Sequence, residues 1–390
     1  MRAAIRIIQV FVGLLFIVSG LVKANDPLGL SYKMQEFFEI WNASLASGDF
    51  FARKPLMSLF SFLHDHSVFL SVTMITLEIV AGVALLLGWR KKPVLYLLLV
   101  LIVFFTFLTG YAFLSKNADG SPKFTNCGCF GDCLPITPLT SFIKDIVLLV
   151  LIALLIAGQR YIEPVFPPRA RLSLLVASLL LTLLLQWYAL NYLPPVDCLP
   201  FKQGNSIPEK MKAPPGSVPD SIVMRFIYEK NGKQYEFALE ELPADLDSYT
   251  YKDRVDRLVR KGNADPPIKG FSLAGSDVDS TQIILGLPRA LIGFALSPEN
   301  PSLWMSELKK LVSAAGARGI PVYMASAEKE ELASLLASNG LNIPVFSCDY
   351  TVIRTAARTN PTFYFLESGT IRKKYSHREL NKAVEYVNQQ

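Results

Sequence analysis

The sequence predicts an all-α membrane bundle followed by a soluble α/β domain. Hydrophobic residues make up 51% and charged residues 18% of the 390 residues, and the mean hydropathy is positive, so the chain is too apolar to be soluble throughout. Five long apolar runs lie before residue 194. Beyond that point the composition becomes that of an ordinary soluble domain, in which strand and helix patterns alternate.

Each apolar run has roughly the 17 to 25 residues that a transmembrane helix needs. The runs predict five spans, at residues 5–21, 68–89, 93–114, 142–158 and 172–193. Arg2 and Arg6 precede the first run, as in a secretory signal. Because four more spans follow and the sequence has no small-x-small cleavage site there, we interpret the first run as a retained anchor.

Lys and Arg residues in the short loops predict the orientation. They precede the first span and lie between spans two and three and between spans four and five, so these loops are expected in the cytoplasm. The residues are Arg2, Arg6, Arg90, Lys91, Lys92, Arg160, Arg169 and Arg171. The prediction is a bacterial inner-membrane protein with a cytoplasmic N-terminus and a periplasmic C-terminal domain, the loops 22–67 and 115–141 also lying outside.

The first outer loop contains two segments, 32–41 and 55–63, in which aromatic side chains recur at helical spacing, with charged residues among them in 32–41. Such segments are typical of helices that lie in the membrane interface. Two interpretations are open: a lid over the outer face of the bundle, or a structural belt.

The part after the last span begins with seven prolines between residues 194 and 219, which predict a linker or collar. Residues 222–228 and 234–239 alternate around Asn231-Gly232 and predict a hairpin. Strands are expected at 290–296, 321–326, 362–366 and 370–375, and helices at 303–315 and 329–338. The predicted division of the chain is 1–165, 166–194, 195–266 and 267–390.

Three of the five cysteines, Cys127, Cys129 and Cys133, fall within seven residues between two spans, and Cys198 is expected on the same oxidising side. A disulfide between Cys127 and Cys129 would close a small, strained and easily reduced ring, which suits a redox catalyst, and Cys133 is near enough to resolve it. All four are candidate redox residues. Two ordinary structural disulfides are the alternative.

Metal binding is a third interpretation of the cysteines, since four thiolates can hold zinc or an iron–sulfur cluster. The spacing Cys-x-Cys-x-x-x-Cys with a remote fourth ligand is not typical of such sites, so no metal is assigned. Cys348, alone in a strand-like stretch, is expected to be a buried small residue. The basic residues are spread out along the chain, and no nucleic-acid partner is expected.

Glu78 lies near the middle of the second span, where a carboxyl group is costly unless it is paired or faces a cavity. One interpretation is that Glu78 carries a proton coupled to thiol oxidation or meets a quinone headgroup, with Lys23 and Lys144 as partners. The other is a packing hydrogen bond made by protonated Glu78. Asp145 is expected near the start of the fourth span, where the helix dipole favours a carboxylate.

The first part of the chain resembles two related membrane families. The residues that resemble DoxX-type proteins are 18–23, Asp26, Pro27, Glu78 and Gly82. The string Cys-Gly-Cys-Phe-Gly at 127–131, followed by Lys144-Asp145, resembles the methylamine-utilisation protein MauE. The resemblance covers about residues 1–165 and implies a four-helix bundle with the fifth span as an addition. It also implies thiol redox at the membrane, or maturation of a disulfide-containing client.

The end of the chain, about residues 267–390, resembles a thioredoxin-like domain. Residues 360–369 look like its cis-proline strand, so Pro361 is expected to be cis. Where thioredoxins carry Cys-x-x-Cys, residues 297–302 contain no cysteine, so this domain is not expected to exchange disulfides by the usual route.

Two functions are therefore carried forward. The leading one is periplasmic thiol–disulfide exchange or client maturation by the four cysteines, with electrons passed to a membrane acceptor such as a quinone. The expected partners are the lipid bilayer and a periplasmic client protein. The alternative is a non-catalytic scaffold whose cysteine-less thioredoxin-like domain binds a partner protein.

Overall fold

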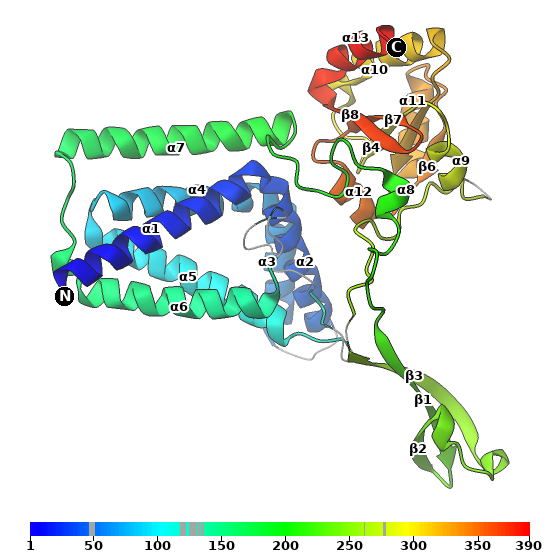
Figure 1. Cartoon of the computed structure of the whole chain (residues 1–390), viewed down its shortest axis with the longest axis horizontal. Helices are drawn as coiled ribbons and strands as arrows, with labels where there is room; N and C mark the ends of the chain where they lie inside the picture. The colour runs from blue at the N-terminus through cyan, green and yellow to red at the C-terminus, as the bar shows by residue number, and fades with distance from the viewer. Residues whose placement is uncertain are drawn as a thin grey trace.

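The computed structural model describes residues 1–46, 51–117, 122–124, 131, 133, 136–260, 262–275 and 278–390. Figure 1 shows a body of long helices, an α/β domain beside one end of it, and a small sheet that projects away from both. The chain enters the α/β domain after its last long helix, leaves it to form the projecting sheet, and returns to complete it.

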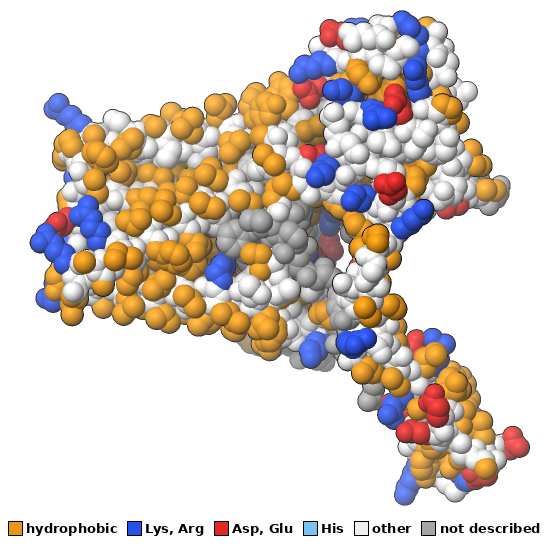
Figure 2. Space-filling model, viewed as in Figure 1, with side chains coloured by type: hydrophobic (Ala, Val, Ile, Leu, Met, Phe, Trp, Pro, Cys, Tyr) orange, Lys and Arg blue, Asp and Glu red, His pale blue; other side chains and the backbone are white. Residues whose placement is uncertain are grey.

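In the part of the chain that the structure describes, five helices are long and apolar enough to cross a membrane, which confirms that the predicted spans are helices of this kind. Four of them form a closed bundle in which each helix packs against two others, and the fifth packs along the outside. Apolar side chains cover the visible sides of this body (Figure 2), as expected of a surface that faces lipid. The helices are α1 (Arg2–Asn25), α4 (Ser67–Leu86), α5 (Lys91–Leu114), α6 (Pro138–Ala157) and, outside the bundle, α7 (Pro168–Asn191).

Small residues bring α1 and α4 close together. A Cβ atom added at Gly82 would lie 2.9 Å from the carbonyl oxygen of Gly13, and one added at Gly20 would lie 2.4 Å from the Ile79 side chain. Close backbone approach through glycine is a common way to pack helices in membranes, where no hydrophobic force draws them together. This pairing places the C-terminal end of α1 beside the middle of α4.

Two shorter helices, α2 (Pro27–Ala46) and α3 (Arg53–Asp65), cross the end of the bundle (Figure 1). They confirm that the aromatic segments of the first long loop are helical. Their rings pack together and onto the bundle: Phe37 stacks on Phe124 at 4.6 Å between centroids, and Trp41 lies 5.3 Å from Phe60 and 5.7 Å from Tyr111. A helical cap therefore covers the end of the bundle from which the cysteine loop emerges.

The projecting sheet has three antiparallel strands in the order β2-β1-β3. Its strands are β1 (Ser221–Lys230), β2 (Lys233–Ala238) and β3 (Thr250–Arg260). The predicted hairpin is confirmed, with Asn231 and Gly232 both at positive φ (55° and 73°), as a primed turn requires. The third strand was not expected from the sequence. Two short 3₁₀ helices join β2 to β3, at Leu239–Glu241 and Leu246–Ser248.

The α/β domain contains a five-stranded sheet in the order β6-β5-β4-β7-β8, in which β4, β5 and β6 are parallel and β7 and β8 antiparallel to their neighbours. The strands are β4 (Ala290–Ala295), β5 (Val322–Ser326), β6 (Val345–Ser347), β7 (Thr362–Glu367) and β8 (Thr370–Ser376). Its main helices are α10 (Met305–Ala317), α11 (Lys329–Ser338), α12 (Tyr350–Ala356) and α13 (Leu380–Asn388).

Helices cover both faces of this sheet because its strands are apolar on both sides. Leu291 packs with α10 and α13 on one face, whereas Ile292, the next residue, packs with α12 on the other. The Asn360–Pro361 peptide bond before β7 is cis, which confirms that prediction. Short turns complete the element list: 3₁₀ helices at Gln159–Tyr161, Pro301–Leu303 and His377–Glu379, and α9 (Thr281–Leu285).

The proline-rich collar, residues 194–212, is packed against the α/β domain rather than extended. Phe201 and Ile207 are 1% and 0% exposed and belong to the core on the α12 face of the sheet. Ile207 begins the short helix α8 (Ile207–Lys210). The Ile207 N–H donates to the carbonyl of Gly369 at 2.9 Å, which fixes the collar to the turn between β7 and β8.

Candidate functional site: a disulfide above a buried ion pair

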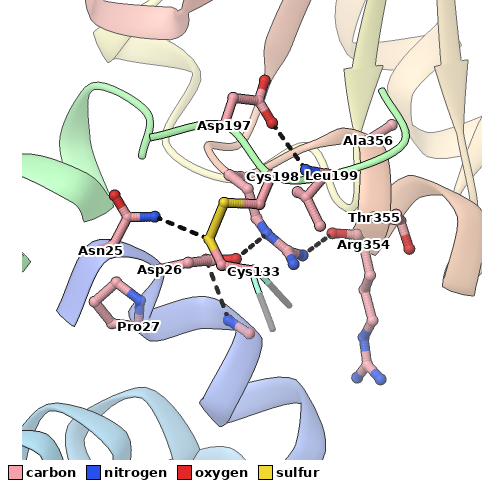
Figure 3. A network of polar contacts seen from close by, with 12 residues as sticks. Asn25, Asp26, Pro27, Cys133, Asp197, Cys198, Leu199, Arg354, Thr355 and Ala356 are labelled. Carbon is pink, nitrogen blue, oxygen red and sulfur yellow. Dashed lines mark hydrogen bonds and ion pairs between the residues drawn. A yellow bond between two sulfur atoms is a disulfide. The ribbon is translucent and has the colours of Figure 1, made fainter. Parts of the chain in front are cut away.

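Cys133 and Cys198 form a disulfide at the end of the bundle, with a Cα–Cα distance of 4.9 Å (Figure 3). This confirms that Cys198 lies within bonding distance of the cysteine loop, as its expected position on the same side implied. Cys127 and Cys129 lie outside the described residues, so their own pairing stays a prediction. Within the chain-entropy model, a bond that closes a loop of 65 residues contributes about 4 kcal/mol to stability.

The C-terminal end of α1 supports the disulfide. A Cβ atom at Gly131 would lie 3.6 Å from the carbonyl oxygen of Val22, so the loop rests directly on the last turn of this helix. The side-chain amide of Asn25 donates to Cys133 Sγ at 3.8 Å, a weak contact to sulfur. It also donates to the carbonyl of Val196 at 2.8 Å, and its oxygen accepts from the Val196 N–H at 2.9 Å. Asn25 thus contacts both chain segments that the disulfide joins, at Cys133 and at Val196.

A buried ion pair joins the bundle to the α/β domain next to the disulfide (Figure 3). Arg358, just after α12, donates to Asp26 Oδ2 at 2.8 Å, and the two side chains are 3% and 9% exposed. Lys374 of β8 pairs with Asp197 at 2.7 Å, one residue before Cys198. Burial lowers the pKa of Lys374, and the neighbouring Asp197 carboxylate offsets only part of this decrease. The disulfide therefore sits where the bundle meets the α/β domain, beside one ion pair that joins these two parts and a second that fixes the collar to β8.

Tyr32 of α2 lies under the same junction. The guanidinium groups of Arg354 and Arg358 lie 4.8 Å and 5.5 Å from its ring centre, within cation–π range. Burial raises the pKa of Tyr32 to about 12, although both arginines oppose the rise. The Arg354 guanidinium also donates to Gln35 Oε1 at 2.5 Å. Two arginines of the α/β domain thus contact the first half of α2.

A second buried ion pair lies inside the bundle, between the C-terminal end of α1 and the middle of α4. Lys23 Nζ lies 2.5 Å from Glu78 Oε2, with 2% and 4% of these side chains exposed. The Lys23 ammonium also lies 4.5 Å from the ring centre of Phe105. Of the two lysines expected as partners for Glu78, Lys23 is confirmed by this contact.

Lys144 pairs with Asp145, at 2.9 Å, on the opposite side of the same cavity. Asp145 is fully buried and also accepts a hydrogen bond from the Thr109 hydroxyl at 3.0 Å. The cavity between the two ion pairs has a volume of about 10 Å³, which is room for about one water molecule. The cavity as it stands is too small for a quinone ring, and contact of Glu78 with a quinone stays a prediction.

Cys198 also forms part of the wall of a much larger, open cavity of about 1020 Å³ between the collar and the α/β domain. Cys198 is half-buried and lines this open cavity, whereas the side chains of Lys23 and Glu78 are almost completely buried. Since Lys23 and Asn25 are neighbours on the last turn of α1, one short segment contacts both the ion pair and the disulfide.

The α/β domain has no cysteine pair of its own. Cys348 is 4% exposed and free, and burial raises the pKa of its thiol to about 12. This agrees with the expected buried, unreactive residue. The cysteine-less turn after β4 is bonded to Asn360, the residue before Pro361: the Asn360 amide donates to the Ser297 carbonyl at 2.9 Å and its oxygen accepts from the Leu296 N–H at 3.1 Å.

Several residues at the junction were missed in the sequence. Arg358, Lys374 and Asp197 are ordinary surface-type residues in their local patterns, and nothing in those patterns indicates their distant partners, Asp26 for Arg358 and each other for Lys374 and Asp197. Asp26 offered a signal, since it directly follows the first span and is one of the residues that carry the DoxX resemblance.

Comparisons with known proteins find two family models. Residues 1–158 match the family Methylamine utilisation protein MauE, which covers the four-helix bundle with α2 and α3 but less than half of the chain. Residues 222–261 match a Domain of unknown function (DUF8463), which corresponds to the projecting sheet. No curated protein and no solved structure matches the chain. The MauE match and the five apolar helices agree on a membrane part at the N-terminal end of the chain.

Proposed function

We propose that this MauE-like membrane protein supports thiol–disulfide exchange with a cysteine-containing client, at the disulfide where its bundle meets its α/β domain. The observation that carries the proposal is the Cys133–Cys198 disulfide, which is anchored by Asn25 and open on one side to a large cavity. We further propose an inner-membrane location with this end in the periplasm. Basic loop residues at the opposite end support it, where Arg2 pairs with Glu163 and Lys91 donates to the Ile162 carbonyl.

The proposed step is an exchange in which electrons and protons balance. A client thiolate attacks Cys198 Sγ from the open cavity, a mixed disulfide forms, and Cys133 leaves as a thiolate beside the Asn25 amide. The second client thiol then displaces Cys198, so the client gains a disulfide and the protein is left with two thiols. Cys127 and Cys129 are proposed to join this relay as further redox residues, beyond the described part of the chain.

Continued turnover requires an oxidised acceptor that takes two electrons, and we propose a membrane quinone as its chemical class. The one-water cavity at Glu78 does not accommodate it, so no step is assigned to the acceptor there. Glu78 and Lys23 are instead proposed to hold charge and a proton close to the disulfide, through the shared end of α1.

A thioredoxin-like identity is proposed for the α/β domain. Its support is the sheet order, the helices on both faces and the cis bond at Pro361. Because the turn at 297–302 lacks cysteine and Cys348 is buried, this domain is proposed to bind rather than to oxidise. The second candidate function follows from the same observation: a non-catalytic scaffold whose α/β domain retains a partner protein while the disulfide is only structural.

The two candidates differ in whether the cysteines change redox state. Membranes that contain the full chain are treated with mild reductant and then re-oxidised, and free thiols are alkylated before and after this treatment. Mass spectrometry then measures, for each cysteine, the fraction that is alkylated. Exchange predicts that a fraction of Cys133 and Cys198 cycles between disulfide and thiol, and that a Cys198→Ser variant stops turnover of a dithiol client. The Cys348→Ser variant, which removes only the buried thiol, serves as the control and is expected to behave as the parent protein.

The scaffold predicts a different result. If Cys127, Cys129, Cys133 and Cys198 all remain locked as disulfides under mild reductant, the exchange function is wrong. Retention of a periplasmic partner by the full-length Cys198→Ser variant would then support the scaffold.

A further inference from the structure

The large cavity beside the disulfide has the features of a binding site. Its volume of about 1020 Å³ is at the upper end of the range for ligand sites. Three segments form its walls: the collar from Cys198 to Lys210, residues 265–270, and the start of α12 with residue 349. Cys198 therefore belongs to a wall of a cavity that the exchange proposal leaves without an assigned occupant.

The walls of this cavity are held in place before anything binds. The N–H of Ile268 donates to the Lys210 carbonyl at 2.9 Å and connects two of the walls. The Asn205 amide donates to the Pro200 carbonyl at 2.7 Å, which closes the collar on itself. Phe201 and Ile268 are buried in the domain core. A preformed cavity spends little free energy on ordering when a ligand enters.

The acidic and basic side chains that line the cavity differ in whether they have partners. Lys269 pairs with Asp265 at 2.6 Å, and the Asp349 carboxylate accepts from two backbone N–H groups at the start of α12, at 2.8 Å and 3.2 Å. Both acids of the lining are therefore engaged. Lys202 and Lys210 take part in no ion pair among the residues that the structure describes, so two uncompensated ammonium groups remain on one side of the cavity.

We propose that this cavity binds an extended acidic segment of the client polypeptide and thereby presents a client cysteine to Cys198. The proposal rests on the exchange function and names the substrate class of that site. Carboxylates of the segment pair with Lys202 and Lys210, and the apolar part of the lining, which includes Pro200 and Val352, packs against its backbone.

Binding is tested apart from chemistry. The full-length protein in nanodiscs of neutral lipid is titrated into labelled peptides of equal length, one rich in Asp and Glu, one neutral and one rich in Lys and Arg. Each peptide has Ser in place of its central Cys, so no disulfide can form. Fluorescence anisotropy is expected to show that the acidic peptide binds most tightly and that added salt weakens its binding.

Charge reversal locates the site. Lys202→Glu with Lys210→Glu is expected to weaken acidic-peptide binding about tenfold, and the two Ala variants to weaken it less but in the same direction. Lys233→Glu with Lys309→Glu changes the net charge equally, at exposed lysines on β2 and α10, and is expected to leave binding unchanged.

The outcomes separate this inference from the exchange function. The Cys198→Ser variant should bind the acidic peptide normally although it has lost exchange activity. If the parent protein binds the acidic peptide but shows no exchange, the exchange function is contradicted and the binding inference is not. Equal binding of the three peptides, or equal loss in both charge-reversed variants, would overturn the inference. The inference would also be overturned if Lys202 and Lys210 were needed only for binding to vesicles of anionic lipid, because the site would then bind lipid headgroups.

Discussion

The two side chains of the Lys23–Glu78 pair are nearly inaccessible to water. Taking two charges out of water is costly, and their attraction offsets that cost only while both partners are present. A buried pair of this kind is therefore not evidence of added stability. Lys23 lies two residues before Asn25, which contacts the disulfide, and a functional role for the charge or the proton of the pair stays a prediction.

We expect Glu78→Gln to destabilise the protein by about 3 to 5 kcal/mol, because it leaves the Lys23 ammonium buried without its counter-charge. Replacing both residues, as Lys23→Met with Glu78→Leu, should recover most of that loss, since the apolar pair needs no solvation. Thermal unfolding of the purified full chain in detergent measures both effects.

The double variant also separates structure from chemistry. If the pair carries a proton for exchange, the stable double variant still exchanges slowly and its pH profile differs from that of the parent. Parent-like exchange would restrict the pair to a structural role, and parent-like stability of Glu78→Gln would contradict the coupling of the two charges.

At the scale of elements, the contact between α1 and α4 depends on glycines that oppose backbone atoms. A side chain can turn away from a new methyl group, but the Gly13 carbonyl 2.9 Å from a Cβ at Gly82 cannot do so without moving the helix. Separation of the helices would also pull Lys23 away from Glu78. The packing and the ion pair are thus parts of one arrangement.

Gly82→Val is expected to destabilise the protein by about 1 to 3 kcal/mol through overpacking. Gly316→Ala is the matched control, since Gly316 lies in α10 with nothing within 4 Å of the added Cβ, and it should be neutral or stabilising by up to about 1 kcal/mol. Thermal unfolding of the two variants in the same detergent makes the comparison. An unfolding temperature for Gly82→Val equal to that of Gly316→Ala would contradict close packing at this crossing.

The elements differ in how far the sequence could predict them. The spans were predictable because each is a long apolar run, and the hairpin because Asn231-Gly232 favours one turn type. The strand β3 was not, because Thr250–Arg260 is rich in charge and lacks a clear apolar alternation; its strand form depends on pairing with β1. The three-residue β6 is likewise defined by its neighbour β5.

At the scale of the whole molecule, the candidate site is a junction. Pairing of Cys198 with the cysteine loop could be expected from shared topology, and Glu78 from its position in an apolar span. The Asp26–Arg358 pair could not, because its partners are 332 residues apart and each lies in a locally unremarkable pattern. Contacts between separately folding parts depend on surfaces that only the finished fold creates.

Arg358→Ala is expected to loosen the junction, because it leaves Asp26 buried without its counter-charge. Hydrogen–deuterium exchange of the full chain should then show faster exchange in α12 and at the start of α2. Arg372→Ala breaks the partly exposed pair between Arg372 of β8 and Glu367 of β7 and should change neither region. Unchanged exchange in Arg358→Ala would show that the disulfide and the remaining contacts hold the domains without this pair.

The disulfide can form only after certain steps of synthesis and membrane insertion are complete. Residues 138–191, with two apolar helices, lie between Cys133 and Cys198. During synthesis Cys133 therefore emerges long before its partner, and the covalent ring can close only after both helices have been inserted and the chain has returned to its starting side. A ribosome-bound chain truncated before residue 198 would carry Cys133 without its partner, so oxidation of this pair reports that insertion of the membrane part is complete.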